Sequence, residues 1–287
     1  MFLHVDGPGI LADGLSVLNP KASSDGNHWQ YHSQSDRHSK IACWAVAFEL
    51  LEHSSLLRRH VQAGKVIFGV NHTMDDFKTG RRKKLDLVIA RPSGAIPSDA
   101  PTLAGHVDKW SIPLTAAQRR RLEALPAAMI APVGSVLVAV EAKACMTAHI
   151  KSLPRLYDEL NSSHLTIHGA TSQALAVGFV MINAAKTFVS PGRNKRDLAS
   201  NAPEISHHPQ PHYLQRTLDK VEEIPRRSGS GQEGFDALGI VVIDMRNDGS
   251  PVSVVTKPPA PQPGDIFQYD QMINRVVHGY DVSFAHI

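Results

Sequence analysis

The chain has 287 residues, and 30 Lys and Arg nearly balance 27 Asp and Glu, which leaves a formal net charge of +3. Its two cysteines exclude a disulfide framework and favour a reducing, cytoplasmic setting. The longest apolar stretch, 127–140, is shorter than the roughly 18 residues of a membrane span and contains Pro132 and Gly134. The first residues lack the pattern of a signal peptide. We therefore expect a cytoplasmic protein without membrane contact.

The first 38 residues, rich in Gly, Ser, Asp and His, predict an irregular N-terminal arm. Between 39 and 60, apolar residues recur at spacings of three and four, which predicts an amphipathic helix that ends before Gly64. Two strands are predicted next, at 65–70 and 83–90.

The segment of about 92–134 is rich in proline and is predicted to be an insertion, with a short helix at 114–125 capped by Thr115. A strand at 135–143 and a helix at 146–160 follow, and Pro154 should kink or break that helix. The polar stretch 161–172 is predicted to be a turn before an apolar strand at 174–185.

The segment of about 190–235 contains few apolar residues and is predicted to be a second insertion with one helix near 213–223. Strands at 239–245 and 252–257 and a last helix, capped by Asp265 and running to about 277, complete the chain. Strands that are apolar on both faces belong inside a sheet covered by helices. We expect one α/β domain over 39–287, with a mixed central sheet flanked by helices and peripheral insertions.

Three charges interrupt the apolar strands. Asp86 stands among apolar residues of one strand, and Glu141 and Lys143 close another. Side chains two apart on a strand share a face, so Glu141 and Lys143 point the same way. Charges at the ends of buried strands must be paired or bind an ion. One interpretation is an ion-pair cluster that fixes the strand register; the other is a metal site, because converging carboxylates are ligands for Mg²⁺.

Asp86 followed by Glu141-Ala142-Lys143 resembles the PD-(D/E)XK nuclease superfamily, whose fold is called restriction-endonuclease-like. The order of the predicted elements over residues 39–185 is similar to the core of that superfamily. Two departures are Leu85, where many members have proline, and the long gap between Asp86 and Glu141. Asp75 and Asp76 are alternative acids in a predicted loop.

The resemblance implies that Asp86 and Glu141 ligate Mg²⁺, which Mn²⁺ could replace, and that Lys143 is the catalytic lysine. Many members add a glutamate from the preceding helix. Glu49 is the candidate here, and Glu52, about one turn later, is the alternative.

Basic side chains near these elements are candidates for contacts with DNA phosphates. Lys151 and Arg155 lie one turn apart on the helix after the motif, with His149 beside them, and Arg81 and Arg82 belong to the basic run 78–84. The other interpretation is an ordinary solvated surface. The histidine-rich segment 207–212 lacks the cysteines or helical spacing of a zinc site, and no dinucleotide, P-loop or α/β-hydrolase motif is present.

The sequence thus predicts a Mg²⁺-dependent DNA endonuclease, such as a restriction enzyme of a restriction-modification system or another defence nuclease. A homodimer is expected, because one site cuts one strand of a duplex. The alternatives are a nuclease-like module that binds nucleic acid or a partner without cutting, and a hydrolase of small phosphodiesters.

Overall fold

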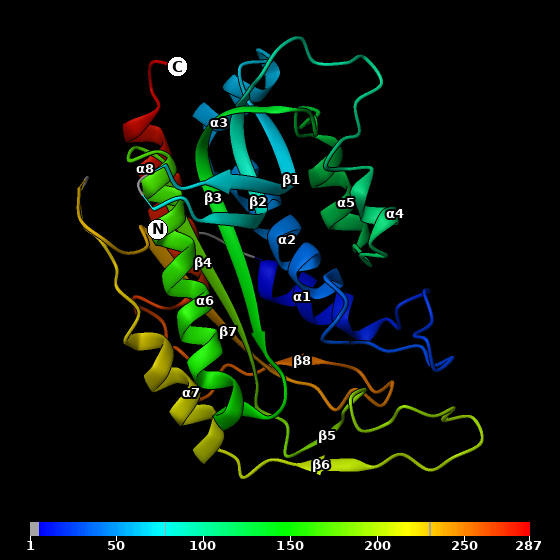
Figure 1. The fold of residues 1–287 in the computed structure, drawn as a ribbon. Helices are drawn as coiled ribbons and strands as arrows, with labels where there is room; N and C mark the ends of the chain where they lie inside the picture. Colours follow the sequence, from blue (N-terminus) through cyan, green and yellow to red (C-terminus); the bar gives the residue numbers. More distant parts are fainter. Residues whose placement is uncertain (1–5, 78, 230) are drawn as a thin grey trace.

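A six-stranded mixed sheet is the centre of the molecule (Figure 1). The computed structural model describes residues 6–77, 79–229 and 231–287. Its sheet has the order β1-β2-β3-β4-β7-β8. These strands are β1 (Ile67–Asp75), β2 (Arg82–Pro92), β3 (Val133–Cys145), β4 (Leu175–Asn183), β7 (Ala237–Asp244) and β8 (Ser253–Val254). The predicted α/β class with a mixed central sheet is confirmed.

The strand directions divide the sheet into two parts. The pairs β1–β2 and β2–β3 are antiparallel, whereas β3–β4 and β4–β7 are parallel. Parallel neighbours require a crossover, and α6 (His149–Ala170) supplies the one between β3 and β4. The chain between β4 and β7 contains a separate small pairing of β5 (Thr187–Val189) with β6 (Ile205–His207), and then α7 (His212–Glu222).

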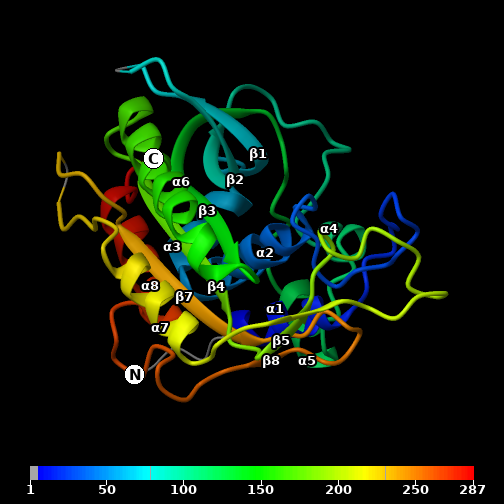
Figure 2. The ribbon, with the colours of Figure 1, turned by 60° about the horizontal axis from the view of Figure 1, so that its bottom comes forward.

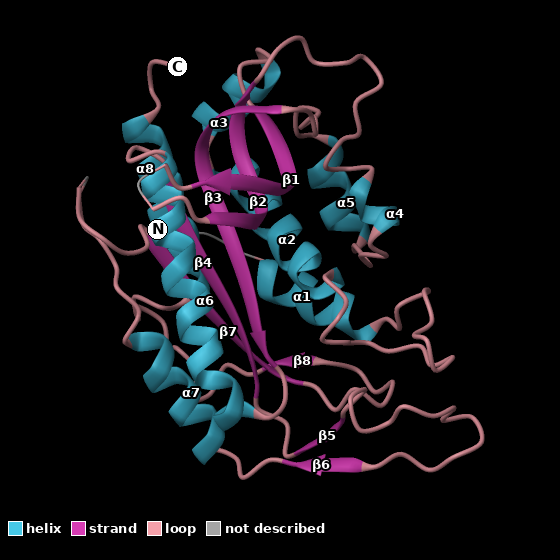
Figure 3. Cartoon of the chain, viewed as in Figure 1, coloured by secondary structure: helices cyan, strands magenta, loops and turns pink. Residues whose placement is uncertain are grey.

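Helices cover both faces of the sheet (Figures 2 and 3). Helices α1 (Gly7–Ser16), α2 (Arg37–His53) and α8 (Tyr269–Ser283) pack on one face, where Trp44 and Phe48 are completely buried. Helices α6 and α7 pack on the other face. Because both faces are covered, β4 is buried along its whole length, as its sequence, apolar up to Asn183 at the end, predicts.

The N-terminal segment is more ordered than predicted. Residues 7–16 form α1, whose Ile10, Leu11 and Leu15 are completely buried against α2 and the sheet. Arg37 fastens it, since its guanidinium donates to the carbonyls of Val17 and Gly14 at 3.1 and 2.9 Å. An irregular arm over all of 1–38 is therefore wrong, because the apolar side chains of this short helix supply part of the core.

The predicted helix at 39–60 is two helices. The chain turns at Ser54, whose side chain accepts a hydrogen bond from Leu57 N and begins α3 (Ser55–Gln62). The last helix begins at Tyr269, because Asp265 caps a turn through Phe267 N and not the helix itself.

Helix α6 is longer than predicted. It runs through Pro154 and continues to Ala170, so the predicted turn at 161–172 is wrong. Pro154 lies in the second turn, where it removes a single hydrogen bond to the preceding turn. In the stretch predicted to be a turn, Ser163, His164, Thr166 and Ile167 are buried. This packing outweighs the weak helix propensity of the polar residues.

The segment between β2 and β3 is an insertion that packs on the sheet. It contains α4 (His106–Lys109) and α5 (Ala116–Glu123), and Thr115 caps α5 as predicted, accepting from Gln118 N. Phe68 N donates to Met129 O at 2.8 Å, which attaches the insertion to β1. The strands on either side of it pair directly, as the long gap in the motif requires.

Candidate functional site

The three strand charges come together where β2 and β3 pair. Leu87 lies opposite Val140, so Asp86 and Glu141 are the next residues along two hydrogen-bonded neighbours. Asp86 accepts hydrogen bonds from Ser39 Oγ at 3.0 Å, Lys40 Nζ at 2.8 Å and Ala142 N at 3.1 Å. Burial raises the pKa of Asp86, but Lys40 and these hydrogen bonds offset burial and hold the pKa below its usual value.

Glu141 and Lys143 form a second pair. Lys143 Nζ lies 2.7 Å from Glu141 Oε1 and 3.2 Å from Glu159 Oε2 on α6. Glu141 is 1 % exposed, and its Oε2 has no hydrogen-bond partner among the described residues. Burial raises the pKa of Glu141, although Lys143 acts in the opposite direction. One buried carboxylate oxygen therefore lacks a donor or a cation.

A cleft of about 430 Å³ gives solvent access to Asp86 and Lys143, whereas the buried Glu141 does not line it. Asp86 and Lys143 line it together with residues before and in the first turn of α2, and with side chains of α6 such as Ser152, Arg155 and Glu159. Figure 2 shows β3 between α2 and α6, the two helices that form the walls. The site thus combines carboxylates and ammonium groups beside a solvent-accessible cleft.

Sequence reasoning missed three residues of this site, His38, Ser39 and Lys40. All three lie in the first turn of α2. His38 lines the cleft, and burial is the main cause that lowers its pKa to about 4, so its imidazole is neutral at pH 7. The signal in the sequence was a polar run at the start of a helix whose later turns are apolar.

Glu49 does not join the cluster. It lies nine residues after Lys40 on α2, about 13 Å farther along the axis. Its Oε1 accepts from Gly7 N at 2.6 Å and from Asp6 N, so Glu49 anchors the start of α1. The alternative Glu52 lies 3.4 Å from Arg121. Glu49 and Glu52 therefore contact other parts of the protein and not the cluster of Asp86, Glu141 and Lys143.

The predicted phosphate-binding residues are scattered. His149 is completely buried and its Nε2 bonds Asn183 O at 2.8 Å, so the expectation that it faces DNA is wrong. Arg155 is exposed at the rim of the cleft, 2.6 Å from Glu159, and Lys151 is exposed on the same helix.

Arg81 and Arg82 are exposed at the β1–β2 turn, where Arg82 pairs with Asp75 at 2.6 Å. Arg82 is four residues from Asp86 on β2, or about 13 Å. The alternative acids are engaged at the same turn: Asp75 pairs with Arg82, and the buried Asp76 accepts from Thr79 N.

The donor set is compatible with Mg²⁺, which often binds through one or two carboxylates and keeps several waters. Asp86 and Glu141 supply two, and the unpartnered Glu141 Oε2 is an oxygen that a cation would satisfy. Within residues 6–77, 79–229 and 231–287, no group of three His, Cys, Asp or Glu side chains is placed to hold a metal. Any ion here would therefore depend on water or substrate for its remaining ligands.

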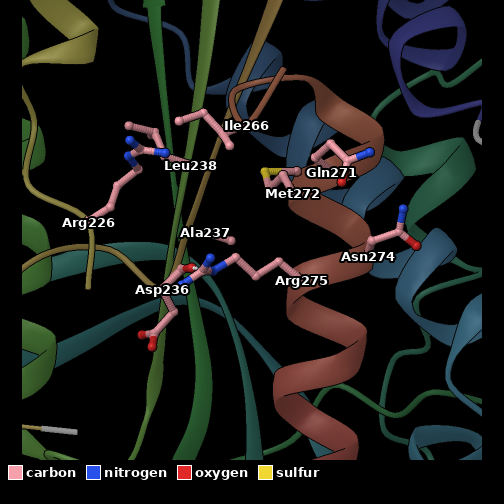
Figure 4. A pocket seen from close by; sticks show the side chains of 9 residues that line it. All are labelled: Arg226, Asp236, Ala237, Leu238, Ile266, Gln271, Met272, Asn274 and Arg275. Atoms are coloured by element: carbon pink, nitrogen blue, oxygen red, sulfur yellow. Dashed lines mark hydrogen bonds between the residues drawn. The ribbon is translucent and has the colours of Figure 1, made fainter. Parts of the chain in front are cut away.

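A second hollow, of about 280 Å³, lies between the start of β7 and α8 (Figure 4). Its charged groups are already engaged by the protein. Arg275 donates to the main-chain carbonyls of Asp236 and Arg227, and Arg226 lies over the ring of Phe267 at 4.4 Å. None of the sequence-predicted site residues lines it. The cleft at β2 and β3 is the better candidate.

Comparisons with family models, curated proteins and solved structures find no match for this chain. In the described part of the chain, no helix has both the length and the apolar character needed to cross a bilayer.

Proposed function

We propose that the protein is a Mg²⁺-dependent DNA endonuclease, of the restriction or other defence type, with its site in the cleft at the ends of β2 and β3. The observation that carries the proposal is the cluster itself: Asp86 and Lys143 line one cleft, and Glu141 lies beside Lys143 with one buried oxygen unpartnered. The order of the elements around this cluster supports the proposal. Strands β1, β2 and β3 are antiparallel, and α6 then connects β3 to the parallel strand β4, which is compatible with the element order expected from the motif.

In the proposed reaction, a water oxygen forms a bond to the phosphorus and the bond from phosphorus to the leaving deoxyribose oxygen breaks. The attacking water releases a proton to solvent, and the leaving oxygen takes one up. A Mg²⁺ ion held by Asp86 and Glu141 would lower the pKa of water and offset phosphate charge. Lys143 would donate hydrogen bonds to the attacking water or a phosphate oxygen. Arg155, at the cleft rim, would contact a neighbouring phosphate.

Two copies of the chain are part of this proposal. A duplex has two strands of opposite direction, so a two-fold homodimer presents one cleft to each strand.

A second candidate function is binding of nucleic acid or a protein partner without cutting. The observation in its favour is that Asp86 already has three hydrogen-bond donors, one of them a buried lysine. A carboxylate saturated in this way is stable without a metal.

Cleavage assays separate the two candidates. Wild type, Lys143→Ala, Glu141→Ala and the exposed control Lys257→Ala are incubated with a mixture of long plasmid and phage DNAs, and with single-stranded DNA, in Mg²⁺ and in chelator. We expect cutting by wild type and the control in Mg²⁺ only, with a loss of at least about 100-fold in the other two. Equal cutting by all four proteins would refute the site. Retardation of DNA without cutting in any condition would favour the binding module.

A further inference from the structure

Lys40 is an unusual residue for the first turn of a helix, because it is only 2 % exposed. Lysine is almost never fully buried unless it is paired. Its ammonium group lies 2.8 Å from Asp86 Oδ1, 2.6 Å from Asn71 Oδ1 and 3.8 Å from Asp36 Oδ2. Lys40 therefore neutralises the carboxylate that the proposed function assigns to a metal ion.

Asn71 is held in an uncommon conformation to make this contact. Its φ is +57°, in the left-handed region that asparagine tolerates better than most residues. Val70 pairs with Leu87 and His72 with Leu85, so Asn71 interrupts the β1–β2 ladder opposite Asp86. The interruption places a neutral oxygen next to Lys40, on the side away from β3.

Lys40 and Lys143 thus each have one of the proposed ligand carboxylates and at least one further partner. Lys40 contacts Asp86 and also Asn71, whereas Lys143 contacts Glu141 and also Glu159. If a cation took over Asp86 and Glu141, both ammonium groups would keep a hydrogen-bond acceptor. Neither lysine would be left buried and unpaired, which is the outcome that normally makes breaking a buried ion pair costly.

We propose that Lys40 is an exchangeable counter-ion of Asp86: it holds the carboxylate in the metal-free protein, retreats to Asn71 when a divalent cation binds, and thereby sets the affinity of the site for that cation. This rests on the proposed function for the identity of the site. Lys40 is a positioning residue that acts through Asp86. A merely structural Lys40 would support the site, so its loss would weaken metal binding; an exchangeable counter-ion competes with the metal, so its loss strengthens metal binding.

Isothermal titration calorimetry with MnCl₂ and MgCl₂, without DNA, tests the proposal. Lys40→Gln keeps a hydrogen-bond donor but removes the charge, and we expect its Kd for the ion to fall by about tenfold. Asn71→Gly fits the left-handed backbone but removes the second partner of Lys40, and we expect its Kd to rise by about threefold. Lys257→Gln, which changes an exposed lysine beyond β8, is the control and should leave the Kd unchanged.

Equal or weaker ion binding by folded Lys40→Gln overturns the proposal, and so does the absence of ion binding by both wild type and Lys40→Gln. If circular dichroism shows that Lys40→Gln does not fold, Asn71→Gly decides, and an unchanged Kd in that variant overturns the proposal. Tighter ion binding by Lys40→Gln together with no DNA cutting by wild type would refute the nuclease function and leave the counter-ion role standing.

Discussion

Lys143 Nζ lies 2.7 Å from Glu141 Oε1, and a single residue, Ala142, separates the two on β3. The lysine is half-buried and also contacts Glu159, whereas the glutamate is fully buried and depends on Lys143 as its nearest cation. The pair is therefore asymmetric: Glu141 depends on Lys143 more than Lys143 depends on Glu141. This asymmetry determines how the two residues respond to substitution.

We expect Lys143→Met to lower the free energy of unfolding by about 2–4 kcal/mol at pH 8, because buried Glu141 would lose its nearest cation, and Lys83 Nζ, 3.9 Å from Glu141 Oε1, is too distant to replace the hydrogen bond. Burial already raises the pKa of Glu141, and without Lys143 its pKa rises further, so the loss should be smaller at pH 5 than at pH 8, because a lower pH favours the neutral carboxyl that needs no partner. Urea denaturation at both pH values measures this. The double variant Lys143→Met, Glu141→Gln should recover much of the loss. A double variant as unstable as the single one at pH 8 would contradict the dependence of Glu141 on Lys143.

Glu49 should make stability depend on pH. Burial is the main cause that raises its pKa from 4.5 to about 8, against the hydrogen bond from Gly7 N. The folded protein therefore binds a proton at Glu49 that the unfolded chain releases above about pH 4.5. The resulting stability is complete below pH 4.5 and is lost as pH rises to about 8. We expect Glu49→Gln, whose amide oxygen can accept the same N–H groups, to remove a slope of up to about 1.4 kcal/mol per pH unit in this window.

Urea denaturation at several pH values between 4.5 and 8.5 checks the slope at Glu49. Glu123→Gln, which changes an exposed glutamate at the end of α5, is the control and should keep the wild-type slope. Parallel pH curves for wild type and Glu49→Gln would show that Glu49 is ionised in the folded protein throughout.

Arg155 offers a matched test of the DNA-binding surface. Arg155 and Arg193 are both exposed arginines paired with a glutamate, at 2.6 Å to Glu159 and 2.7 Å to Glu204, but only Arg155 lines the cleft. We expect Arg155→Gln to weaken DNA binding by about tenfold at low salt and to reduce the salt dependence by about one phosphate contact. Arg193→Gln should bind like wild type. Fluorescence anisotropy over a range of NaCl concentrations measures the DNA affinity of each variant. An equal loss of affinity in the two variants would show that the cleft is not part of the DNA-binding surface.

Arg37 should be irreplaceable by lysine. Besides Val17 and Gly14, its guanidinium donates to the carbonyls of Trp110 and Ser111, so one side chain joins α1, α2 and the insertion. A lysine keeps the charge but cannot reach four separate carbonyls. We expect Arg37→Lys to lower the free energy of unfolding by about 2–4 kcal/mol in urea denaturation. Arg193→Lys, at an exposed position, should change it by less than about 0.5 kcal/mol; similar effects of the two variants would contradict the role of Arg37.

The strand charges could be predicted because they break apolar runs. Asp86, Glu141 and Lys143 each stand between two apolar residues, and β2 pairs with β3 as the motif that they resemble requires. Lys40 and His38 give no such signal, since polar residues in the first turn of a helix are usually solvated. Their place in the site depends on how α2 packs across β2, which no local pattern specifies.

Two predictions of helix boundaries were wrong for a different reason. Residues 7–16 contain three glycines and a proline, which are poor helix formers, yet Pro8 lies at the start of α1, where proline is tolerated, and the apolar residues that follow are buried. The break at Ser54 could not be seen, because apolar residues continue at helical spacing into Leu57 and Val61. In both places tertiary packing outweighed local propensity.

The interrupted ladder at Asn71 also divides the β1–β2 hairpin into two stretches. The inner stretch continues into the buried centre of the sheet, whereas the outer stretch, from His72 to Asp75 opposite Arg82 to Leu85, ends in an exposed turn. Local opening of a protein follows such breaks in cooperativity. Amide hydrogens of the outer stretch should therefore exchange with solvent through local opening, and those of Gly69 and Val88 only with the unfolding of the sheet. The boundary between the two regimes falls at Asp86, so the proposed ligand stands at the edge of the most protected part of the molecule.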